Sequence, residues 1–206
     1  MAPTQERRRR MPRAQRERQM IAVAEEIFAE RGYQAASMDD IAERVGVSKP
    51  MLYEYFGSKE GLLVACIRQA RTELLGLTLA SVEGVSTAEE ALRRGLEAFF
   101  VYIDSHRRSW NLLRNEAAVA GQAAMDEIEA VRQQQTAVNT TLFASYLPHL
   151  PARDLEAYAE IIVGACERLA MWYVGREDVG PADAAELIMR MVWSGLSGAI
   201  ATNGDK

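Results

Sequence analysis

The segment that decides the fold spans residues 37–56, which read SMDDIAERVGVSKPMLYEYF. Ser37 can cap a helix with its hydroxyl, and Asp39 and Asp40 suit the positive end of that helix. Gly46 can adopt the positive φ at which helices commonly end. The sequence therefore predicts a short helix between Ser37 and Gly46. Its buried face consists of Met38, Ile41, Ala42 and Val45, which recur at helical spacing.

A second short helix is predicted directly after a tight turn. Val47 points inward from this turn, Ser48 can cap the next helix, and Pro50 suits its first turn. This helix runs from about residue 49 to residue 56, with Leu52 and Phe56 on its inner face. Two short helices joined by a glycine-containing turn indicate a helix-turn-helix, in which the second helix enters the major groove of DNA. Spacing alone leaves a small helical bundle without a DNA partner as the alternative.

The rest of the chain is also predicted to be helical. Apolar residues recur at helical spacing across residues 16–31, and Gly32 follows at the C-cap position. Residues 57–58 end the second short helix and cap a fourth helix over about residues 59–82. Breaks between five further helices fall at residues 86–87, 106–107, 121–122, 148–151 and 175–181. We therefore expect an all-α protein of about nine helices, with an N-terminal three-helix helix-turn-helix domain and a larger helical domain.

Charge is distributed unevenly along the chain. The 206 residues are 49% hydrophobic, which is enough to bury a sizeable core, and their net charge is −5. Residues 1–60 carry 11 Lys or Arg against 10 Asp or Glu, whereas residues 61–206 carry 13 against 19. We interpret residues 1–13 as a basic, flexible arm that either contacts DNA or stays solvated. No apolar run reaches the length of a membrane span or of a secretory signal, so we expect a cytoplasmic protein.

The composition argues against metal, disulfide and enzymatic chemistry. Cys66 and Cys166 lie 100 positions apart without a CxxC motif, and His106 and His149 are the only histidines. We expect no metal site and no cofactor. Residues 195–199 read Gly-Leu-Ser-Gly-Ala, which lacks the final glycine of a nucleophile elbow and follows no predicted strand. The sequence also contains no phosphate-binding loop or dinucleotide motif, so we do not expect an enzyme.

Residues 37–63, SMDDIAERVGVSKPMLYEYFGSKEGLL, closely resemble the DNA-binding domain of the TetR family of bacterial repressors. The resemblance extends over about residues 14–74. Its matching elements are Gly-Tyr at 32–33, Ile-Ala at 41–42, Gly-Val-Ser at 46–48, Leu-Tyr-x-Tyr-Phe at 52–56 and Ser-Lys-Glu at 58–60. The resemblance implies a DNA-binding domain at residues 14–74 and an effector-binding and dimerisation domain at residues 75–206. The latter matches the family only in length and helicity.

The same resemblance implies a homodimer that binds a palindromic operator in double-stranded DNA. Repression is the commoner mode of this family. We therefore expect a repressor that a small, mainly apolar ligand releases from its operator. An architectural protein that binds DNA without recognising a specific operator is the alternative.

Nine residues of the helix-turn-helix are candidate DNA contacts. The resemblance implies that Tyr53 and Tyr55 hold the phosphate backbone, although a ring with a hydroxyl also suits the edge of a small core. Lys49 suits either a guanine or a phosphate. Ser37 and Lys59 stand at helix N-termini, where an anion is favoured, or they act only within the protein. The full set is Ser37, Ser48, Lys49, Pro50, Met51, Tyr53, Glu54, Tyr55 and Lys59.

Two places depart from the commoner family pattern, in which Gly-Thr precedes Leu-Tyr and a basic or amide residue separates the tyrosines. Pro50 and Met51 replace the Gly-Thr pair, so the methionine offers an apolar surface to a thymine methyl group but no hydrogen bond. Glu54 stands between the tyrosines. Phosphate repels its carboxylate, whereas cytosine N4 can donate to it. We therefore predict that Glu54 faces a base edge or solvent.

The resemblance also implies a small-molecule pocket lined by the fourth to eighth helices. Asn139 and Glu167 are the most informative candidates, because a polar group that faces an apolar interior needs a partner, which an inducer can supply. The other candidates also suit an ordinary core. The complete set of predicted lining residues is Phe99, Tyr102, Trp110, Leu113, Asn139, Phe143, Glu167 and Met171.

Two apolar stripes follow Pro151 and Pro181. The first contains Leu155, Tyr158, Ile161, Ile162, Ala165, Leu169 and Trp172, and the second contains Leu187, Ile188, Met191, Leu196 and Ile200. Both helices are too apolar for a solvent-exposed surface. The resemblance implies that these last two helices pair with those of a second subunit in a four-helix bundle. Burial within one subunit is the alternative.

Overall fold

The computed structural model describes residues 11–107, 110 and 120–203, in which every regular element is an α-helix. The eight helices of these residues are α1 (Arg13–Ala35), α2 (Met38–Val45), α3 (Lys49–Phe56), α4 (Lys59–Ser81), α5 (Ala88–Ser105), α7 (Gln122–Tyr146), α8 (Ala152–Tyr173) and α9 (Pro181–Asn203). The all-α prediction is confirmed. The further helix predicted between residues 107 and 121 falls mostly outside the described residues. None of the helices in the described ranges is long and apolar enough to cross a membrane.

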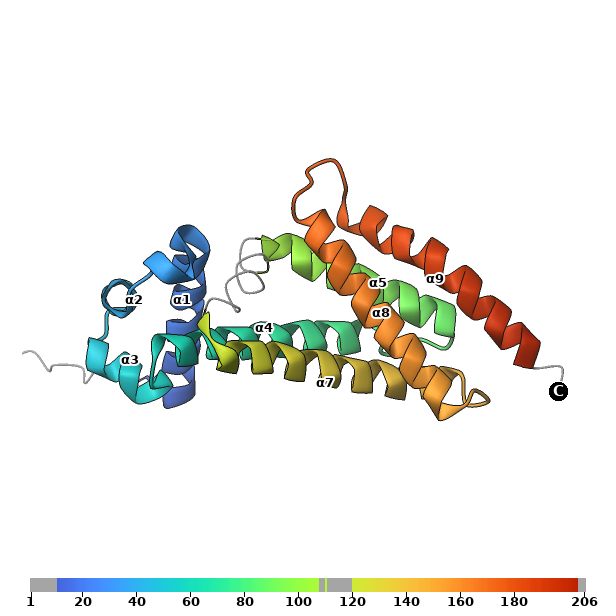
Figure 1. The fold of residues 1–206 in the computed structure, drawn as a ribbon, viewed down its shortest axis with the longest axis horizontal. Coiled ribbons are helices and arrows are strands. Elements are labelled where there is room, and N and C mark those ends of the chain that lie inside the picture. The colour runs from blue at the N-terminus through green and yellow to red at the C-terminus, as the bar shows by residue number, and fades with distance from the viewer. Residues whose placement is uncertain (1–10, 108–109, 111–119, 204–206) are drawn as a thin grey trace, which may run out of the picture.

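Helix α4 joins the two ends of the molecule (Figure 1). Helices α1, α2 and α3 gather around its beginning, whereas α5, α7, α8 and α9 form the other end. Helix α7 runs beside α4 and packs against it, and α5 packs against both α4 and α9 (Figure 1). We call α1–α3 and the first two turns of α4 the reading head.

Two hydrophobic clusters form the core, and α4 contributes to both. The first cluster holds the reading head together around Phe28, Ile41, Leu52 and Leu63, which are all fully buried. It also contains Ala124 from the beginning of α7. The head therefore packs against α7 as well as α4.

The second cluster fills the larger domain. It brings together Leu74 of α4, Phe100 of α5, Tyr173 of α8 and Met189 of α9. The rings of Phe100 and Tyr173 meet edge to face, with their centres 5.6 Å apart. Because α4 enters both clusters, a displacement of this helix in one cluster is transmitted to the other.

The boundaries of α2 and α3 follow the sequence closely. Helix α2 begins after its N-cap Ser37 and ends before Gly46, whose φ of 78° and ψ of 36° are left-handed. Helix α4 ends at Ser81, one residue before its predicted end. Helix α5 begins after Thr87, whose hydroxyl oxygen accepts a hydrogen bond from the Glu90 backbone N–H at 3.3 Å.

Helix α1 is longer than predicted at both ends. It begins at Arg13 instead of residue 16, and it continues past Gly32 to Ala35. Gly32 was expected to end the helix, but it interrupts the helical geometry with a φ of 79°, after which one further turn follows. The glycine therefore produces a kink that redirects the end of α1 toward α4.

Candidate DNA-binding and ligand-binding sites

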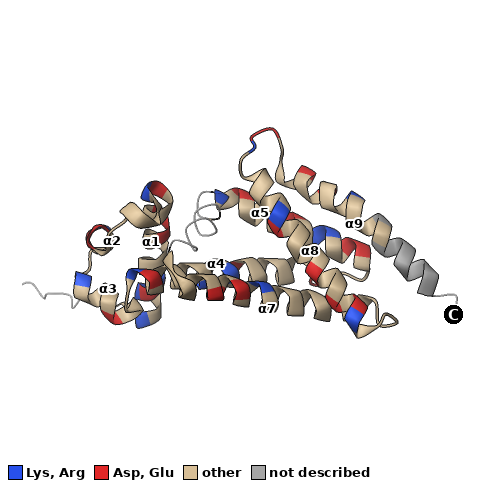
Figure 2. Cartoon of the chain, in the orientation of Figure 1, with Lys and Arg blue, Asp and Glu red and all other residues tan. Residues whose placement is uncertain are grey.

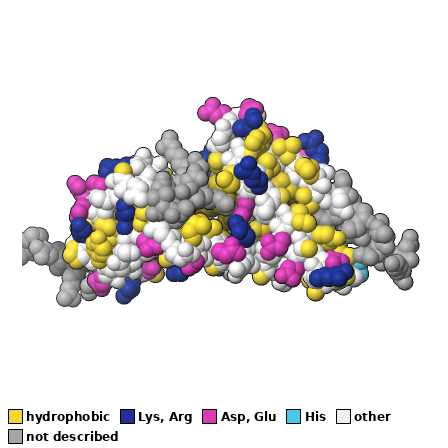
Figure 3. Space-filling model, viewed as in Figure 1, with side chains coloured by type: hydrophobic (Ala, Val, Ile, Leu, Met, Phe, Trp, Pro, Cys, Tyr) yellow, Lys and Arg dark blue, Asp and Glu magenta, His cyan; other side chains and the backbone are white. Residues whose placement is uncertain are grey.

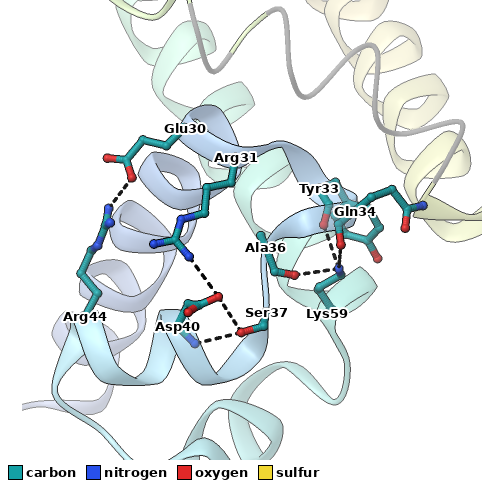
Figure 4. A network of polar contacts seen from close by, with 9 residues as sticks. All are labelled: Glu30, Arg31, Tyr33, Gln34, Ala36, Ser37, Asp40, Arg44 and Lys59. Atoms are coloured by element: carbon teal, nitrogen blue, oxygen red, sulfur yellow. Dashed lines mark hydrogen bonds and ion pairs between the residues drawn. The ribbon is translucent and has the colours of Figure 1, made fainter.

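The start of α2 is held by a polar network around Asp40 (Figure 4). The Ser37 hydroxyl accepts a hydrogen bond from the Asp40 backbone N–H at 3.1 Å and donates one to the Asp40 carboxylate at 2.7 Å. The Arg31 guanidinium lies 3.2 Å from the same carboxylate. The hydrogen bond from Ser37 and the charge of Arg31 lower the pKa of Asp40. Ser37 is therefore a helix cap whose hydroxyl is committed to Asp40.

Lys59 fastens the end of α1 to the start of α4. Its ammonium donates to the backbone carbonyls of Tyr33, Gln34 and Ala36 at 2.7, 3.3 and 2.9 Å (Figure 4). It also stands 4.5 Å from the centre of the Tyr33 ring, which is a cation–π contact. An ammonium has three donors, and all three have acceptors within the chain. The sequence left open whether Lys59 meets an anion or acts only within the protein. This geometry favours a contact within the protein.

The outer face of α3 carries four of the predicted DNA contacts. Lys49, Pro50, Tyr53 and Glu54 are all exposed, and 43% of Tyr53 is accessible to solvent although its ring is large and apolar. The Lys49 ammonium lies 2.7 Å from the Asp39 carboxylate of α2. That hydrogen bond raises the pKa of Lys49. The face is therefore accessible, and its lysine is paired with a carboxylate of the neighbouring helix.

Met51 and Tyr55 are half-buried and lie against α1. The Arg13 guanidinium is 4.9 Å from the centre of the Tyr55 ring, and an Arg16 nitrogen is 3.8 Å from the Met51 sulfur. The sequence placed Arg13 in a flexible arm, whereas it begins α1. Arg13 and Arg16 therefore stand beside the predicted DNA-binding face; the sequence had offered Arg13 only as part of the arm, and it had not singled out Arg16.

Ser48 does not cap α3 with its side chain, so this prediction was wrong. It occupies the N-cap position in an extended conformation, but its hydroxyl makes no capping hydrogen bond. The reason lies in the two residues that a cap would bind. Pro50 has no N–H, and the Met51 N–H already bonds the Ser48 carbonyl oxygen at 3.0 Å.

A cavity of about 150 Å³ lies in the larger domain between α4, α5, α7 and α8. The wall formed by α4 and its C-cap residue runs from Ile67 to Val82, which corresponds to about 22 Å along the helix. Ile67 also belongs to the core of the reading head, so the cavity begins where the head ends. The wall is mostly aliphatic and aromatic, and on α5 it includes the small residues Ala88, Ala91 and Gly95.

Three ion pairs join α7 to its neighbours at the cavity wall. Glu127 of α7 is only 8% exposed, and it lies 2.8 Å from Arg68 and 3.5 Å from Arg71, both of α4. Arg132 of α7 lies 3.0 Å from Glu167 of α8. Hydrogen bonds to these carboxylates raise the pKa of Arg68 and of Arg132. The charged residues of the described wall, Arg71, Arg132 and Glu167, therefore all have a partner of opposite charge.

Two carboxylates, Glu25 of α1 and Glu73 of α4, lie near each other where α1 meets α4. Burial and the nearby charge of Glu73 raise the pKa of Glu25 from 4.5 to about 7. Tyr102 of α5 lies close to this pair and donates to the Ala70 carbonyl at 3.0 Å, and burial is the main cause that raises its pKa. The described residues contain no group of three or more His, Cys, Asp or Glu side chains that could hold a metal ion.

Comparison with known proteins identifies the family. The model described as "Bacterial regulatory proteins, tetR family" matches residues 20–66, and the model described as "Tetracyclin repressor-like, C-terminal domain" matches residues 88–195. The chain belongs to the TetR family of transcriptional regulators. The first match covers most of the reading head, and the second covers α5 and most of the other cavity-forming helices.

Relatives of known name agree with this TetR-family assignment. The HTH-type transcriptional activator FasR of Mycolicibacterium smegmatis is 31% identical over 197 residues, which is 91% of this chain and 86% of that protein. The HTH-type transcriptional regulator EthR of Mycobacterium tuberculosis is 32% identical over 94 residues, which is 45% of this chain and 44% of that protein. The chain is therefore similar to DNA-binding regulators over nearly its whole length.

Solved structures show the same architecture. A TetR-like transcriptional regulator from Rhodococcus sp. RHA1 is 34% identical and superposes with a TM-score of 0.71 over 92% of this chain and 100% of that chain. A putative transcriptional regulator from Pseudomonas aeruginosa PAO1 is only 17% identical, yet its TM-score is 0.79 over 94% of this chain and 96% of that chain. The second likeness concerns the fold alone.

The structure of this TetR-family chain brings most of the predicted pocket residues together. The cavity is lined by Phe99, Tyr102, Trp110, Asn139, Phe143 and Glu167. Met171 was wrongly predicted, because it is 42% exposed and is absent from the described wall. The described wall contributed by α8 consists of Ile162, Val163, Cys166 and Glu167, so it ends one turn before Met171. Leu113 lies outside the described residues.

The sequence predicted that the fourth helix lines the pocket but singled out none of its residues, and it did not indicate the small residues of α5. Leu74 and Thr78 of α4 line the cavity, as do Ala88, Ala91 and Gly95 of α5. The available signal was the recurrence of small residues at three- and four-residue spacing beside the larger apolar residues of α5. Such a pattern indicates a helix face that leaves space instead of filling it.

The apolar stripes of α8 and α9 divide between the interior and the surface. Ile162 and Ile188 are buried within the subunit. In contrast, Ile161 and Trp172 of α8 are 58% and 39% exposed, and Met191 of α9 is 84% exposed. Figure 3 shows hydrophobic side chains gathered on the surface over α8. Burial within the subunit therefore accounts for only part of each stripe.

Proposed function

We propose that this chain is a homodimeric repressor, without enzymatic activity of its own, that a small, mainly apolar ligand releases from a palindromic operator. The observation that supports this proposal is the continuity of α4. Residues 62–67 of this helix belong to the core of the reading head, and the same helix forms the cavity wall from Ile67 to Val82. A ligand that widens the cavity must displace α4, and this displacement changes the position of the head.

The proposed DNA contacts come from α3 and from the start of α1. Lys49, Tyr53 and Glu54 are exposed on α3, and Arg13 and Arg16 lie beside them. Acidic and basic residues are interspersed over α1–α3 (Figure 2), so attraction to DNA does not come from a uniformly basic surface. We therefore expect Lys49 to exchange Asp39 for a phosphate or a guanine when the operator binds.

The proposed dimer interface is the exposed apolar face of α8 and α9. Burial of Ile161, Trp172 and Met191 against a second copy removes large apolar side chains from water, which favours association. A twofold axis through this interface presents two reading heads to a palindrome. The double variant Ile161→Glu with Met191→Glu should therefore be monomeric in analytical ultracentrifugation, whereas the wild type sediments as a dimer.

Selection of bound sequences from a random DNA pool tests the DNA-binding part of the proposal. We expect a palindrome with two half-sites, to which Tyr53→Ala binds more weakly than the wild type. A pool without any consensus after selection would support an architectural protein and contradict the proposal.

A reporter gene under this operator tests the sign of regulation. FasR is named an activator, so the reporter must be able to register both signs. Repression predicts higher expression when the regulator gene is deleted. Lower expression would establish activation instead.

The ligand-release part can be tested with N-phenyl-1-naphthylamine, a neutral apolar fluorophore. We expect it to fluoresce in the cavity and to weaken operator binding. Ala91→Phe fills part of the cavity wall and should lose the fluorophore while it retains the operator. Release of the operator from Ala91→Phe at the same fluorophore concentration would place the effect outside the cavity.

A further inference from the structure

The inward face of α7 carries two carboxamides where an unbroken apolar stripe would be expected. Ile128, Gln135, Asn139, Leu142 and Tyr146 all line the cavity, at spacings that keep them on one side of the helix. Gln135 and Asn139 are one turn apart, so their side chains are neighbours. The two carboxamides therefore form an uncharged polar band on a mostly apolar wall, whose charged members are Arg71, Arg132 and Glu167.

Neither carboxamide has a hydrogen-bond partner among the described residues. Polar groups elsewhere on the wall are already engaged: the Thr78 hydroxyl donates to the Leu74 carbonyl at 2.9 Å, and the Tyr146 hydroxyl donates to the Val85 carbonyl at 3.0 Å. A carboxamide has two N–H donors and a carbonyl acceptor, and both side chains are half-buried, so water can bond them until a ligand takes its place. These two side chains are therefore available to a bound molecule.

The wall leaves space at the level of the carboxamides. The Arg71–Glu127 ion pair joins α4 to α7 on one side of the band, and on the other side the Tyr146–Val85 hydrogen bond joins α7 to the segment that follows α4. A Cβ atom on Gly95 of α5 would meet Thr78 and Val82 only at 3.9 and 4.0 Å. Neighbouring atoms therefore leave enough space for a side chain at position 95, so steric crowding does not explain the glycine. Its missing side chain adds room opposite α4.

The charges of the wall do not select a charged ligand. Arg71 is paired with Glu127, and Arg132 is paired with Glu167, so each cation already has an anion close by. A ligand with its own charge would have to displace one of these partners. A neutral ligand would not.

We propose that the cavity binds a neutral, elongated and mainly apolar molecule that carries an amide carbonyl part-way along its length. The side-chain N–H groups of Gln135 and Asn139 both donate to the ligand carbonyl oxygen, which has two lone pairs. The apolar ends of the ligand lie along the α4 wall toward Ile67 and toward Val82. This inference rests on the proposed function in one respect, namely that both place the effector in this cavity.

The first test needs no ligand. Gln135→Leu and Asn139→Leu remove polar groups that lack partners in the described chain, so each should raise Tm by about 2–4 °C. Gln133→Leu is the matched control on the same helix, because Gln133 is exposed and donates to Glu129; it should not raise Tm. A lower Tm for Gln135→Leu or Asn139→Leu would mean that the carboxamide stabilises the protein itself, and the proposal would be wrong.

The second test uses N-hexylhexanamide, whose amide lies midway between two hexyl chains, to displace N-phenyl-1-naphthylamine. We expect displacement from the wild type and from Gln133→Leu. The double variant Gln135→Leu with Asn139→Leu should bind the amide at least about tenfold more weakly while it keeps its affinity for the fluorophore. Equal affinity of wild type and double variant for the amide, or no displacement from the wild type, would overturn the proposal.

Operator binding by the same variants separates this inference from the proposed function. We expect all of them to bind the selected palindrome as the wild type does, since none of the changed side chains lies in the reading head. If the palindrome binds but the amide does not, only the ligand class is wrong. If no palindrome is bound by any protein, the proposed function itself fails.

Discussion

The reading head and the cavity use polar side chains in opposite ways. In the head, Ser37 and Asp40 bind each other, and the three donors of Lys59 all find carbonyl oxygens of the chain. In the cavity, Gln135 and Asn139 have no such partner among the described residues. The head is therefore fixed by its own contacts before it meets DNA, whereas the cavity has half-buried polar groups whose hydrogen bonds are left to water or to a ligand.

The largest expected effect comes from Glu25 of α1. Whereas the polar groups of the head have favourable partners, this carboxylate lies near a second carboxylate, Glu73. The pKa of Glu25 is about 7 in the folded protein and 4.5 in the reference state, so folding favours the protonated form. The favourable contribution is complete below pH 4.5 and is lost as the pH rises through 7. At pH 8, Glu25→Gln should therefore stabilise the protein by up to about 3 kcal/mol.

Urea unfolding at pH 5.5 and pH 8 measures this effect. The stabilisation by Glu25→Gln should be much smaller at pH 5.5 than at pH 8. Glu26→Gln, at the neighbouring and exposed position, is the control and should show no such dependence. Identical pH profiles for the wild type and Glu25→Gln would show that Glu25 is not protonated in the folded protein near neutral pH.

The next effect tests whether Lys59 acts within the head. Lys59→Met removes an ammonium from three backbone carbonyls and should destabilise the protein by about 2 kcal/mol, with weaker operator binding as a consequence. Chemical unfolding and operator titration measure the two quantities. Lys49→Met is the comparison, because its exposed ion pair with Asp39 contributes little to stability. A fully stable Lys59→Met variant that fails to bind DNA would identify Lys59 as a DNA contact.

A smaller effect is expected where the two regions meet, at the ion pair of Glu127 with Arg68 and Arg71. Glu127→Gln keeps the size of the side chain but removes its charge, and because Arg68 is largely exposed the loss of stability should be about 1 kcal/mol. The contact of α4 with α7 should loosen, so the distance between the two heads of the proposed dimer should vary more. Spin labels on α2, measured by pulsed electron resonance, report that distribution. A distribution as narrow as that of the wild type would assign the positioning of α4 to other contacts.

The two regions also differ in what the sequence could predict. Helices α2 and α3 were placed correctly because their limits depend on local features, namely the hydroxyl of Ser37 and the positive φ of Gly46. The role of Lys59 was not predictable in this way. Its acceptors lie more than twenty residues earlier, and they reach it only because Gly32 bends the end of α1.

In the cavity, the sequence could predict which kinds of residue line the wall. It could not predict which side of its helix each residue occupies. Asn139 and Glu167 were selected as polar groups in an apolar region, and both line the wall. Met171 fits the same apolar pattern but faces outward. Which side of α8 faces the cavity depends on how α8 crosses α7, and that crossing is not encoded in the spacing of either helix alone. Gln135 was missed because it is the last of three consecutive glutamines in a polar-rich helix, and their spacing does not show which of them faces the cavity.

The smallest expected effect concerns base preference within the head, at Glu54. This residue is exposed on α3 between Tyr53 and Tyr55. Its carboxylate can accept from cytosine but is repelled by phosphate, whereas a glutamine can both donate and accept. Glu54→Gln should therefore change the preferred base at one position of each half-site by about fivefold, equivalent to about 1 kcal/mol, while Tm stays unchanged. Repeating the operator selection with this variant measures the change. Unaltered preference at every base pair would leave Glu54 as a solvent-facing residue, and a uniform gain in affinity on all sequences would place it near the phosphate backbone.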